Sequence, residues 1–197
     1  MEAKIENREL DPQQSLKLIT SIINESRKTL EKNAGTPMIL WGTLTLITSL
    51  VIWGLWSGTG NPQWNLLWLA MGVVGYPMNY LWMRKHSVGA RTWLDSVLGY
   101  VWTLFGVFSI VLAVLCFLWV LMPMVALVML LLGFATALTG VLTKSWLIIC
   151  AGTVTALVGV PLSFTLAPYD MILLFAGAAL ITLILPGVVM NVNSKRR

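Results

Sequence analysis

The polar side chains within the apolar part of this sequence that could take part in chemistry gather around one proline. Tyr76, Asn79 and Tyr80 flank Pro77. A proline inside a helix frees a backbone carbonyl and bends the helix, so these groups could line a small polar cavity. The alternative is that Asn79 hydrogen-bonds to a neighbouring helix. The pattern favours this alternative, because polar residues commonly join helices within membranes.

A second polar group is basic and follows shortly after. It consists of Arg84, Lys85, His86 and Arg91. These side chains could bind anionic lipid headgroups or an acidic segment of a partner. The alternative, which the pattern favours, is a signal for membrane orientation, with Arg91 paired to Asp95 one turn further on.

Catalytic chemistry has little support in the sequence. Ionisable side chains inside membrane helices are costly and therefore usually mark function. Here Asp95 and Asp170 fall at the ends of apolar stretches, and His86 is the single histidine. The motifs of metalloproteases, serine hydrolases and phosphate-binding loops are missing. We expect no enzymatic activity, no catalytic residue, no metal and no cofactor.

The elements that carry these residues are apolar helices. The chain is 57% hydrophobic and only 11% charged, whereas soluble domains carry about 25% charged residues. Four long stretches contain no ionised side chain: 33–83, 96–143, 145–169 and 171–194. A spanning helix needs about 20 apolar residues, so the first two stretches hold two spans each. The sequence predicts an all-α integral membrane protein with six transmembrane helices, at about 38–56, 64–83, 96–120, 124–142, 145–164 and 169–190.

A cytoplasmic amphipathic helix is predicted ahead of the spans, over residues 11–33. Its apolar stripe consists of Leu16, Ile19, Ile23 and Leu30, widened by Leu18 and Ile22. Asn33-Ala34-Gly35 is a typical helix end, and Thr36 and Pro37 are typical of the start of the next helix. The stripe could rest among lipid headgroups, pack on the ends of the spans, or pair with another chain.

These elements divide the chain into three parts. Residues 1–35 form a cytoplasmic N-terminal segment, 36–191 the transmembrane domain, and 192–197 a basic cytoplasmic tail. Small residues within the spans predict close packing of helices. They are Gly133, Ala137, Gly140, Gly152, Ala156, Ala176 and Gly177.

The basic residues predict the orientation. All 13 Lys and Arg residues fall before span 1, after spans 2 and 4, or after span 6. Basic residues stay on the cytoplasmic side, so both termini are expected there, in a bacterial inner membrane. The expected partners are the lipid bilayer and either a second copy or another membrane protein, without nucleic acid.

The start of the chain resembles a known group of proteins. An SLxLIxxMIxxxK helix followed by LLWG is typical of a family of small, uncharacterised multi-span inner-membrane proteins of Bacteroidetes-type bacteria. Here the likeness covers residues 10–44 and is carried by Ser15, Leu16, Leu18, Ile19, Ile22, Ile23 and Leu40-Trp41-Gly42. The resemblance implies a bacterial inner-membrane location and no particular activity.

Two functions remain in view. The first is a non-enzymatic assembly, accessory or regulatory module that acts through helix–helix contacts and its cytoplasmic face. The second is a subunit of a transporter or channel for an uncharged or hydrophobic solute, with broken helices at Pro77, Pro161 and Pro186.

Overall fold

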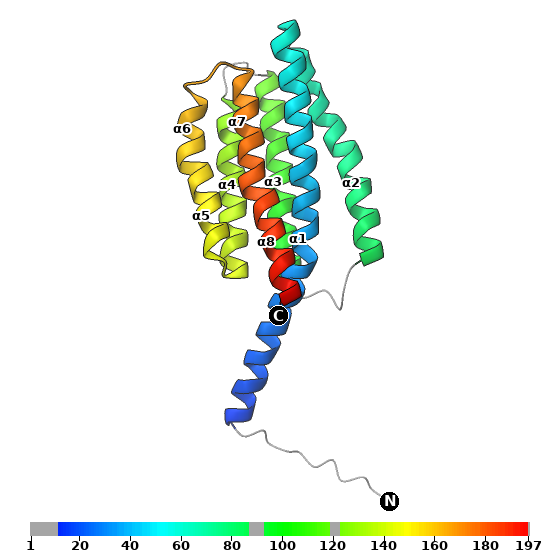
Figure 1. The fold of residues 1–197 in the computed structure, drawn as a ribbon, viewed down its shortest axis with the longest axis vertical. Helices are drawn as coiled ribbons and strands as arrows, with labels where there is room; N and C mark the ends of the chain where they lie inside the picture. Colours follow the sequence, from blue (N-terminus) through cyan, green and yellow to red (C-terminus); the bar gives the residue numbers. More distant parts are fainter. Residues whose placement is uncertain (1–11, 87–92, 119–122, 197) are drawn as a thin grey trace, which may run out of the picture.

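The computed structural model describes residues 12–86, 93–118 and 123–196. Its elements, in chain order, are α1 (Pro12–Thr59), the 3₁₀ turn η1 (Pro62–Leu66), α2 (Leu67–His86), α3 (Trp93–Leu118), α4 (Met124–Thr143), α5 (Trp146–Val154), η2 (Thr155–Gly159), α6 (Val160–Ser163), α7 (Asp170–Ala179), η3 (Leu180–Ile184) and α8 (Leu185–Arg196). The segments α5–η2–α6 and α7–η3–α8 are each continuous helices. The long helices lie side by side in a bundle, and one end of α1 projects from it (Figure 1). The prediction of an all-α chain is confirmed for the described residues.

Helix α1 corrects one sequence prediction. It runs for 48 residues without a break, so the predicted amphipathic helix and the first span are one helix. Asn33-Ala34-Gly35 does not end it, and Thr36 and Pro37 do not begin a new one. The reason is tertiary contact, because a Cβ added at Gly35 would lie 2.9 Å from the carbonyl oxygen of Gly187. Gly35 therefore allows α8 to approach α1 and does not terminate a helix.

The true end of α1 is at Gly60. This residue has a φ of +68°, a left-handed conformation that glycine adopts without steric cost. Its N–H donates to the carbonyl of Trp56 at 2.8 Å, which closes the last turn as in a common helix C-cap.

Helices α1 and α4 are at the centre of two groups. Helix α1 packs on α7, η3 and α8 and, separately, on α2, while α4 packs on α5, η2 and α3. The core that joins them contains Leu30, Ala34, Met38, Leu98, Leu132, Ile148, Ala179, Leu183 and Met190. At the far end of α1 the indole Nε1 of Trp53 donates to a carboxylate oxygen of Asp170 at 3.3 Å. This bond ties α1 to the start of α7.

Glycines allow the close contact between α4 and α5. A Cβ added at Gly152 would lie 2.5 Å from both the backbone N of Ala137 and the carbonyl oxygen of Gly133. One added at Gly140 would lie 2.5 Å from the backbone N of Ile149. The sequence prediction of close packing is confirmed here. It is wrong for Gly177, which has no such neighbour within 4 Å.

Two π-helical segments, η2 and η3, interrupt the last two long helices. Each ends two residues before a proline, Pro161 after η2 and Pro186 after η3. A proline donates no backbone N–H, and its ring collides with the carbonyl four residues earlier. The wider π turn relieves this collision. The prolines therefore account for both segments.

Within the described residues, five helical stretches are long and apolar enough to cross a membrane. They are Asn33–Thr59, Trp93–Cys116, Met124–Thr143, Trp146–Ser163 and Asp170–Val192. This composition supports a multi-pass membrane protein. Helix α2, the second of the six predicted spans, is not among these five stretches; its sequence contains polar residues around Pro77 and ends in Arg84, Lys85 and His86.

Candidate functional site

The projecting end of α1, which we call the stalk, comprises residues 12–29. It leaves the bundle beyond the ends of the other helices (Figure 1). Eighteen residues at 1.5 Å each make it roughly 27 Å long. In proteins most of the stability of a helix comes from tertiary packing and not from the helix alone. The stalk is held in helical form because it continues directly into the buried part of α1.

One face of the stalk is aliphatic and uncovered. We call this face the stripe, and its exposed fractions run from 50% to 69%. It consists of Leu16, Leu18, Ile19, Ile22 and Ile23. Successive positions seven residues apart differ by only about 20° around a helix, so Leu16 and Ile23 lie on the same side as Leu30. Leu30 is fully buried in the bundle, so the stripe continues the face of α1 that packs on its own core.

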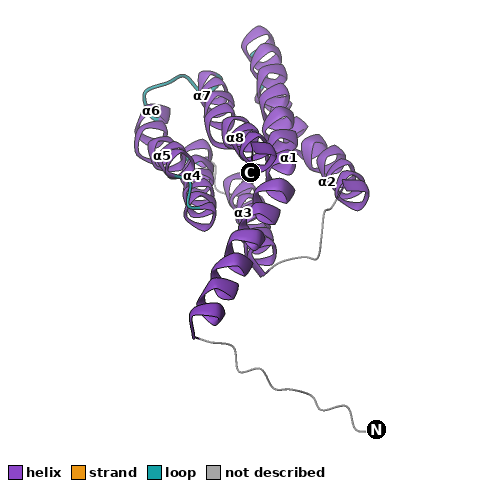
Figure 2. Ribbon diagram, turned by 60° about the horizontal axis from the view of Figure 1, so that its bottom comes forward, coloured by secondary structure: helices purple, strands orange, loops and turns teal. Residues whose placement is uncertain are grey.

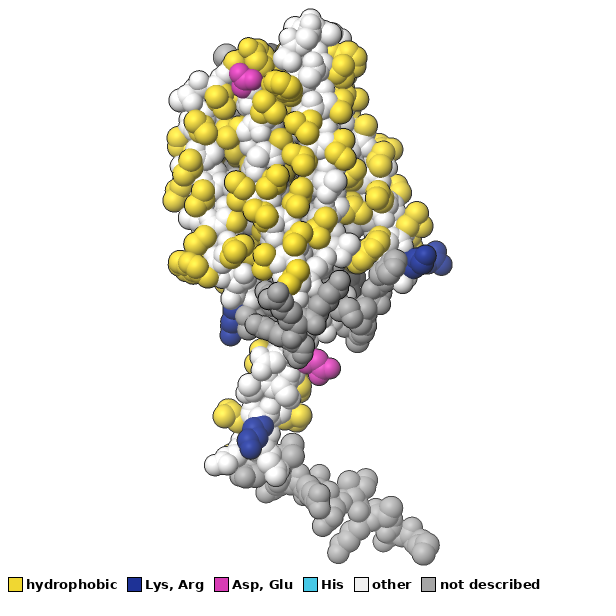
Figure 3. Space-filling view, viewed as in Figure 1, with side chains coloured by type: hydrophobic (Ala, Val, Ile, Leu, Met, Phe, Trp, Pro, Cys, Tyr) yellow, Lys and Arg dark blue, Asp and Glu magenta, His cyan; other side chains and the backbone are white. Residues whose placement is uncertain are grey.

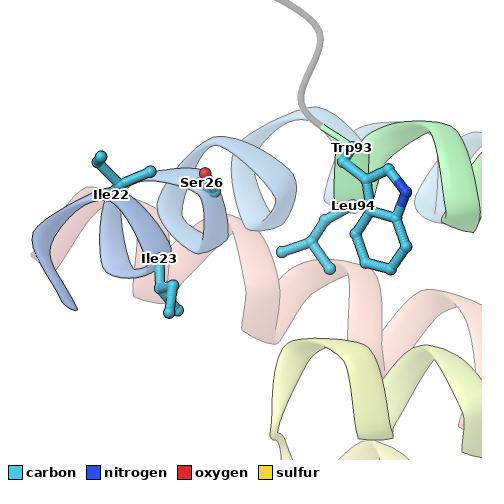
Figure 4. Close-up of a pocket in the computed structure, with 5 residues that line it drawn as sticks. All are labelled: Ile22, Ile23, Ser26, Trp93 and Leu94. Carbon is cyan, nitrogen blue, oxygen red and sulfur yellow. The ribbon is translucent and has the colours of Figure 1, made fainter. Parts of the chain in front are cut away.

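A hollow of about 280 Å³ lies where the stripe reaches the bundle. Figure 4 shows its five lining residues, Ile22, Ile23 and Ser26 from α1 and Trp93 and Leu94 from the start of α3. The Trp93 side chain is 76% exposed. The hollow is therefore an apolar site at the surface, with room for a large side chain of a partner.

The opposite face of the stalk is polar. Lys17, Ser21 and Asn24 are all exposed, and the Ser21 hydroxyl donates to the carbonyl of Leu18 at 2.8 Å. Figure 3 shows single basic and acidic side chains along the stalk, below a bundle surface on which most of the coloured side chains are hydrophobic. The stalk thus has one face suited to water and one suited to another apolar surface.

The predicted basic group is only partly described. Arg84 and Lys85 are exposed on the last turn of α2, and His86 is its final residue. Arg91 lies outside the described residues. Lys144 is exposed at the turn between α4 and α5, and Lys and Arg side chains lie at the lower edge of the hydrophobic surface in Figure 3.

Tyr76, Asn79 and Tyr80 all lie on α2, but the two phenols are not enclosed. Tyr76 is 61% exposed and Tyr80 is 65% exposed. The ring of Tyr76 meets Trp41 of α1 edge to face, with centroids 5.3 Å apart. The Asn79 amide nitrogen donates to the sulfur of Met83 at 3.7 Å, within the same helix. The contacts of Tyr76 are therefore those of a packing residue.

Buried hydroxyl groups inside the bundle bond mostly to their own helices. Thr45, Thr139 and Thr182 each donate to the carbonyl four residues earlier, at 2.7–2.8 Å. Ser49 and Thr136 are fully buried without a hydrogen-bond partner. Over the described ranges, no group of three or more His, Cys, Asp or Glu side chains is placed to hold a metal ion.

Comparison with protein-family models, curated proteins and solved structures gives no significant match. The structure places the predicted stripe residues on one exposed helix, whereas the hollow beside Trp93 was missed. Hydrophobic periodicity within one helix gives no signal for a contact with a helix about 70 residues away.

Proposed function

We propose that this chain is an assembly or accessory module of a bacterial inner membrane, without enzymatic activity, and that its stalk binds a helix of another chain. One observation carries the proposal. Five aliphatic side chains of the stripe are half exposed or more, on a helix that stands outside the bundle. Soluble surfaces rarely keep such a contiguous apolar patch unless it binds a partner. The family resemblance of residues 10–44 supports the proposed location.

The energetics of the stripe are adequate for binding. Fully burying a Leu or Ile side chain contributes about 1.5–3 kcal/mol. Covering the exposed half of five such side chains therefore contributes roughly 4–7 kcal/mol. Association costs at least about 4 kcal/mol in lost freedom of motion. A partner held in the same membrane has already lost part of that freedom, so one helix is a sufficient partner.

We also propose a membrane topology in which α2 crosses the membrane as a sixth span, in addition to the five apolar stretches described above. Its 20 residues extend about 30 Å, the thickness of a bilayer core. A Cβ added at Gly75 would lie 2.7 Å from the Trp41 ring, and the Thr45 hydroxyl oxygen lies 3.7 Å from the sulfur of Met71. These contacts hold α2 beside the apolar part of α1 and support its crossing at the same depth.

Reporter fusions test the topology. With α2 crossing the membrane and both termini in the cytoplasm, a reporter after Asn61 is expected outside and reporters after His86 and Arg197 inside. The reason is that basic residues remain on the cytoplasmic side. An external signal after His86 would show that α2 does not cross. An external signal at the C-terminus would overturn the orientation.

Photo-cross-linking in native membranes tests the function of the stripe. A photoreactive residue at position 19 is expected to give a discrete adduct of higher mass, because Ile19 faces the proposed partner. Position 21 is the matched control, since Ser21 lies on the opposite face of the same helical turn. Absence of an adduct at position 19, or equal labelling at both positions, would overturn the proposal.

A further inference from the structure

We infer that α2 binds a transmembrane helix of a different protein inside the bilayer; the inference goes beyond the stalk and rests on the proposed crossing of α2. The binding surface, which we call the α2 face, consists of Leu69, Val73, Tyr76 and Tyr80, with exposed fractions from 61% to 74%. Their spacing of four, three and four residues places them on one side of the helix. At about 100° per residue they lie roughly 100–160° around α2 from Gly75, which packs on Trp41 of α1. The α2 face therefore points away from α1.

Helix α2 stands at the side of the bundle. Figures 1 and 2 show it next to α1, on the opposite side of α1 from α5 and α6, and its main packing is on α1. A Cβ added at Gly106 of α3 would lie 3.5 Å from the Tyr76 hydroxyl oxygen, so α3 passes beside the α2 face. Only 6% of the apolar window of α3 is buried, against 28–44% in the other four candidate spans. A helix that covers the α2 face therefore also meets uncovered surface on α3.

The α2 face carries polar groups at a depth where lipid offers them no partner. Tyr76 lies near the middle of the 20 residues of α2, about 15 Å from either end, too far for its phenol to reach the interface. Neither the Tyr76 nor the Tyr80 hydroxyl has a hydrogen-bond partner among the described residues. Pro77 has no N–H, so the carbonyl of Val73 loses its usual helical donor. Polar groups left unpaired in hydrocarbon are costly.

These polar groups select a helix as the occupant. Lipid tails form no hydrogen bonds, whereas Ser, Thr, Asn, Gln and His side chains bond across neighbouring membrane helices. The α2 face extends over 11 residue steps, from Leu69 to Tyr80, or about 16 Å along the axis, which suits a helix lying along α2. The partner helix is expected to carry such a side chain near the middle of the membrane, with small residues beside the two rings.

A second copy of this chain is a less suitable occupant. Its α2 would place the same large side chains against each other, whereas closely packed membrane helices have small residues at their contact. The exposed hydroxyls of Thr103 in α3 and Thr153 in α5 already donate to the carbonyls four residues earlier, each at 2.8 Å. They have no proton to offer to the Val73 carbonyl. The expected partner helix therefore belongs to another protein.

Photo-cross-linking of the full chain in native membranes tests the inference. A photoreactive residue at position 73 is expected to give a discrete adduct with a different protein, because Val73 lies on the α2 face and is 74% exposed. Position 78 is the matched control. Met78 is 52% exposed and lies about 140° further around the same helix. At least about tenfold less protein adduct is expected there, because position 78 faces lipid.

Removing the two hydroxyls tests the chemistry of the contact. The double variant Tyr76→Phe with Tyr80→Phe keeps both rings, and it is expected to lower the yield of the position-73 adduct roughly tenfold, because hydrogen bonds across membrane helices are lost. Tyr169→Phe is the control, since it removes a phenol that is 39% exposed at the start of α7, and it is expected to leave the yield unchanged. An undiminished adduct in the double variant would overturn the inference.

The outcomes separate this inference from the proposed role of the stalk. A protein adduct at position 19 with none at position 73 leaves the proposed function standing and overturns the α2 contact, and the opposite result does the reverse. Labelling of lipid only at position 73, equal protein labelling at positions 73 and 78, or an adduct made of two copies of this chain would each overturn the inference. So would an external reporter signal after His86, because α2 would then not cross the membrane.

Discussion

Replacing Gly152 with alanine is expected to destabilise the protein strongly, although it adds one methyl group. The new Cβ would lie 2.5 Å from the backbone N of Ala137 and from the carbonyl oxygen of Gly133. Both contacts are with backbone, which cannot rotate aside, so α5 must move away from α4 along their whole contact. Overpacking of this kind costs about 1–3 kcal/mol, and we expect the upper end. For a chain of this size that corresponds to roughly 6–12 °C in the midpoint of thermal unfolding, measured in detergent.

Gly177→Ala is the control for this experiment. Gly177 is also a glycine in a long helix, but a Cβ added there has no neighbour within 4 Å. Alanine has a higher helix propensity than glycine. The midpoint of thermal unfolding of the Gly177→Ala variant is therefore expected to stay level or rise slightly. Equal losses for Gly152→Ala and Gly177→Ala would mean that α4 and α5 do not approach as closely as described.

The difference between these two glycines marks the limit of what the sequence predicts. Gly133, Gly152 and Gly177 all lie in apolar stretches with small residues nearby, and the pattern predicted close packing for all three. Which face of a helix meets a neighbour depends on the positions of the other helices. The sequence of one helix does not contain that information, so Gly177 was assigned wrongly.

The junction in α1 shows the same limit for helix ends. Asn33-Ala34-Gly35 followed by Thr36 and Pro37 has the composition of a helix stop and a new start. Glycine serves equally in a left-handed cap and in a close contact between helices. Here the contact of Gly35 with α8 determines that α1 continues, because tertiary packing overrides the local preference for a helix end.

The candidate site was predictable in part. The stripe follows from the 3.6-residue period and was found from the sequence. Whether it would rest on lipid, on the spans or on another chain was open, because that depends on the direction in which the helix leaves the bundle. The stalk keeps the direction of α1 because the helix is continuous through Gly35. The close approach of α8 at Gly187 stabilises this continuous helix.

Gly187→Ala is therefore expected to weaken the attachment of the stalk. A Cβ at this position would lie 2.7 Å from the carbonyl oxygen of Gly35 and 3.1 Å from the backbone N of Ile39, so α8 must shift away from α1. We expect a loss of about 1–3 kcal/mol, measured as a lower unfolding midpoint in detergent. Gly35→Ala obstructs the same crossing from the other side, whereas Gly54→Ala, also in α1, meets no such neighbour within 4 Å and is the control.

The effects of substitutions at residues that share one contact are not additive. Once one methyl group has separated the two helices, the second methyl group finds more space. The double variant of Gly35 and Gly187 is thus expected to lose less than the sum of the two single losses. Strict additivity would show that the two glycines act at separate contacts, and the direction of the stalk would then need another cause.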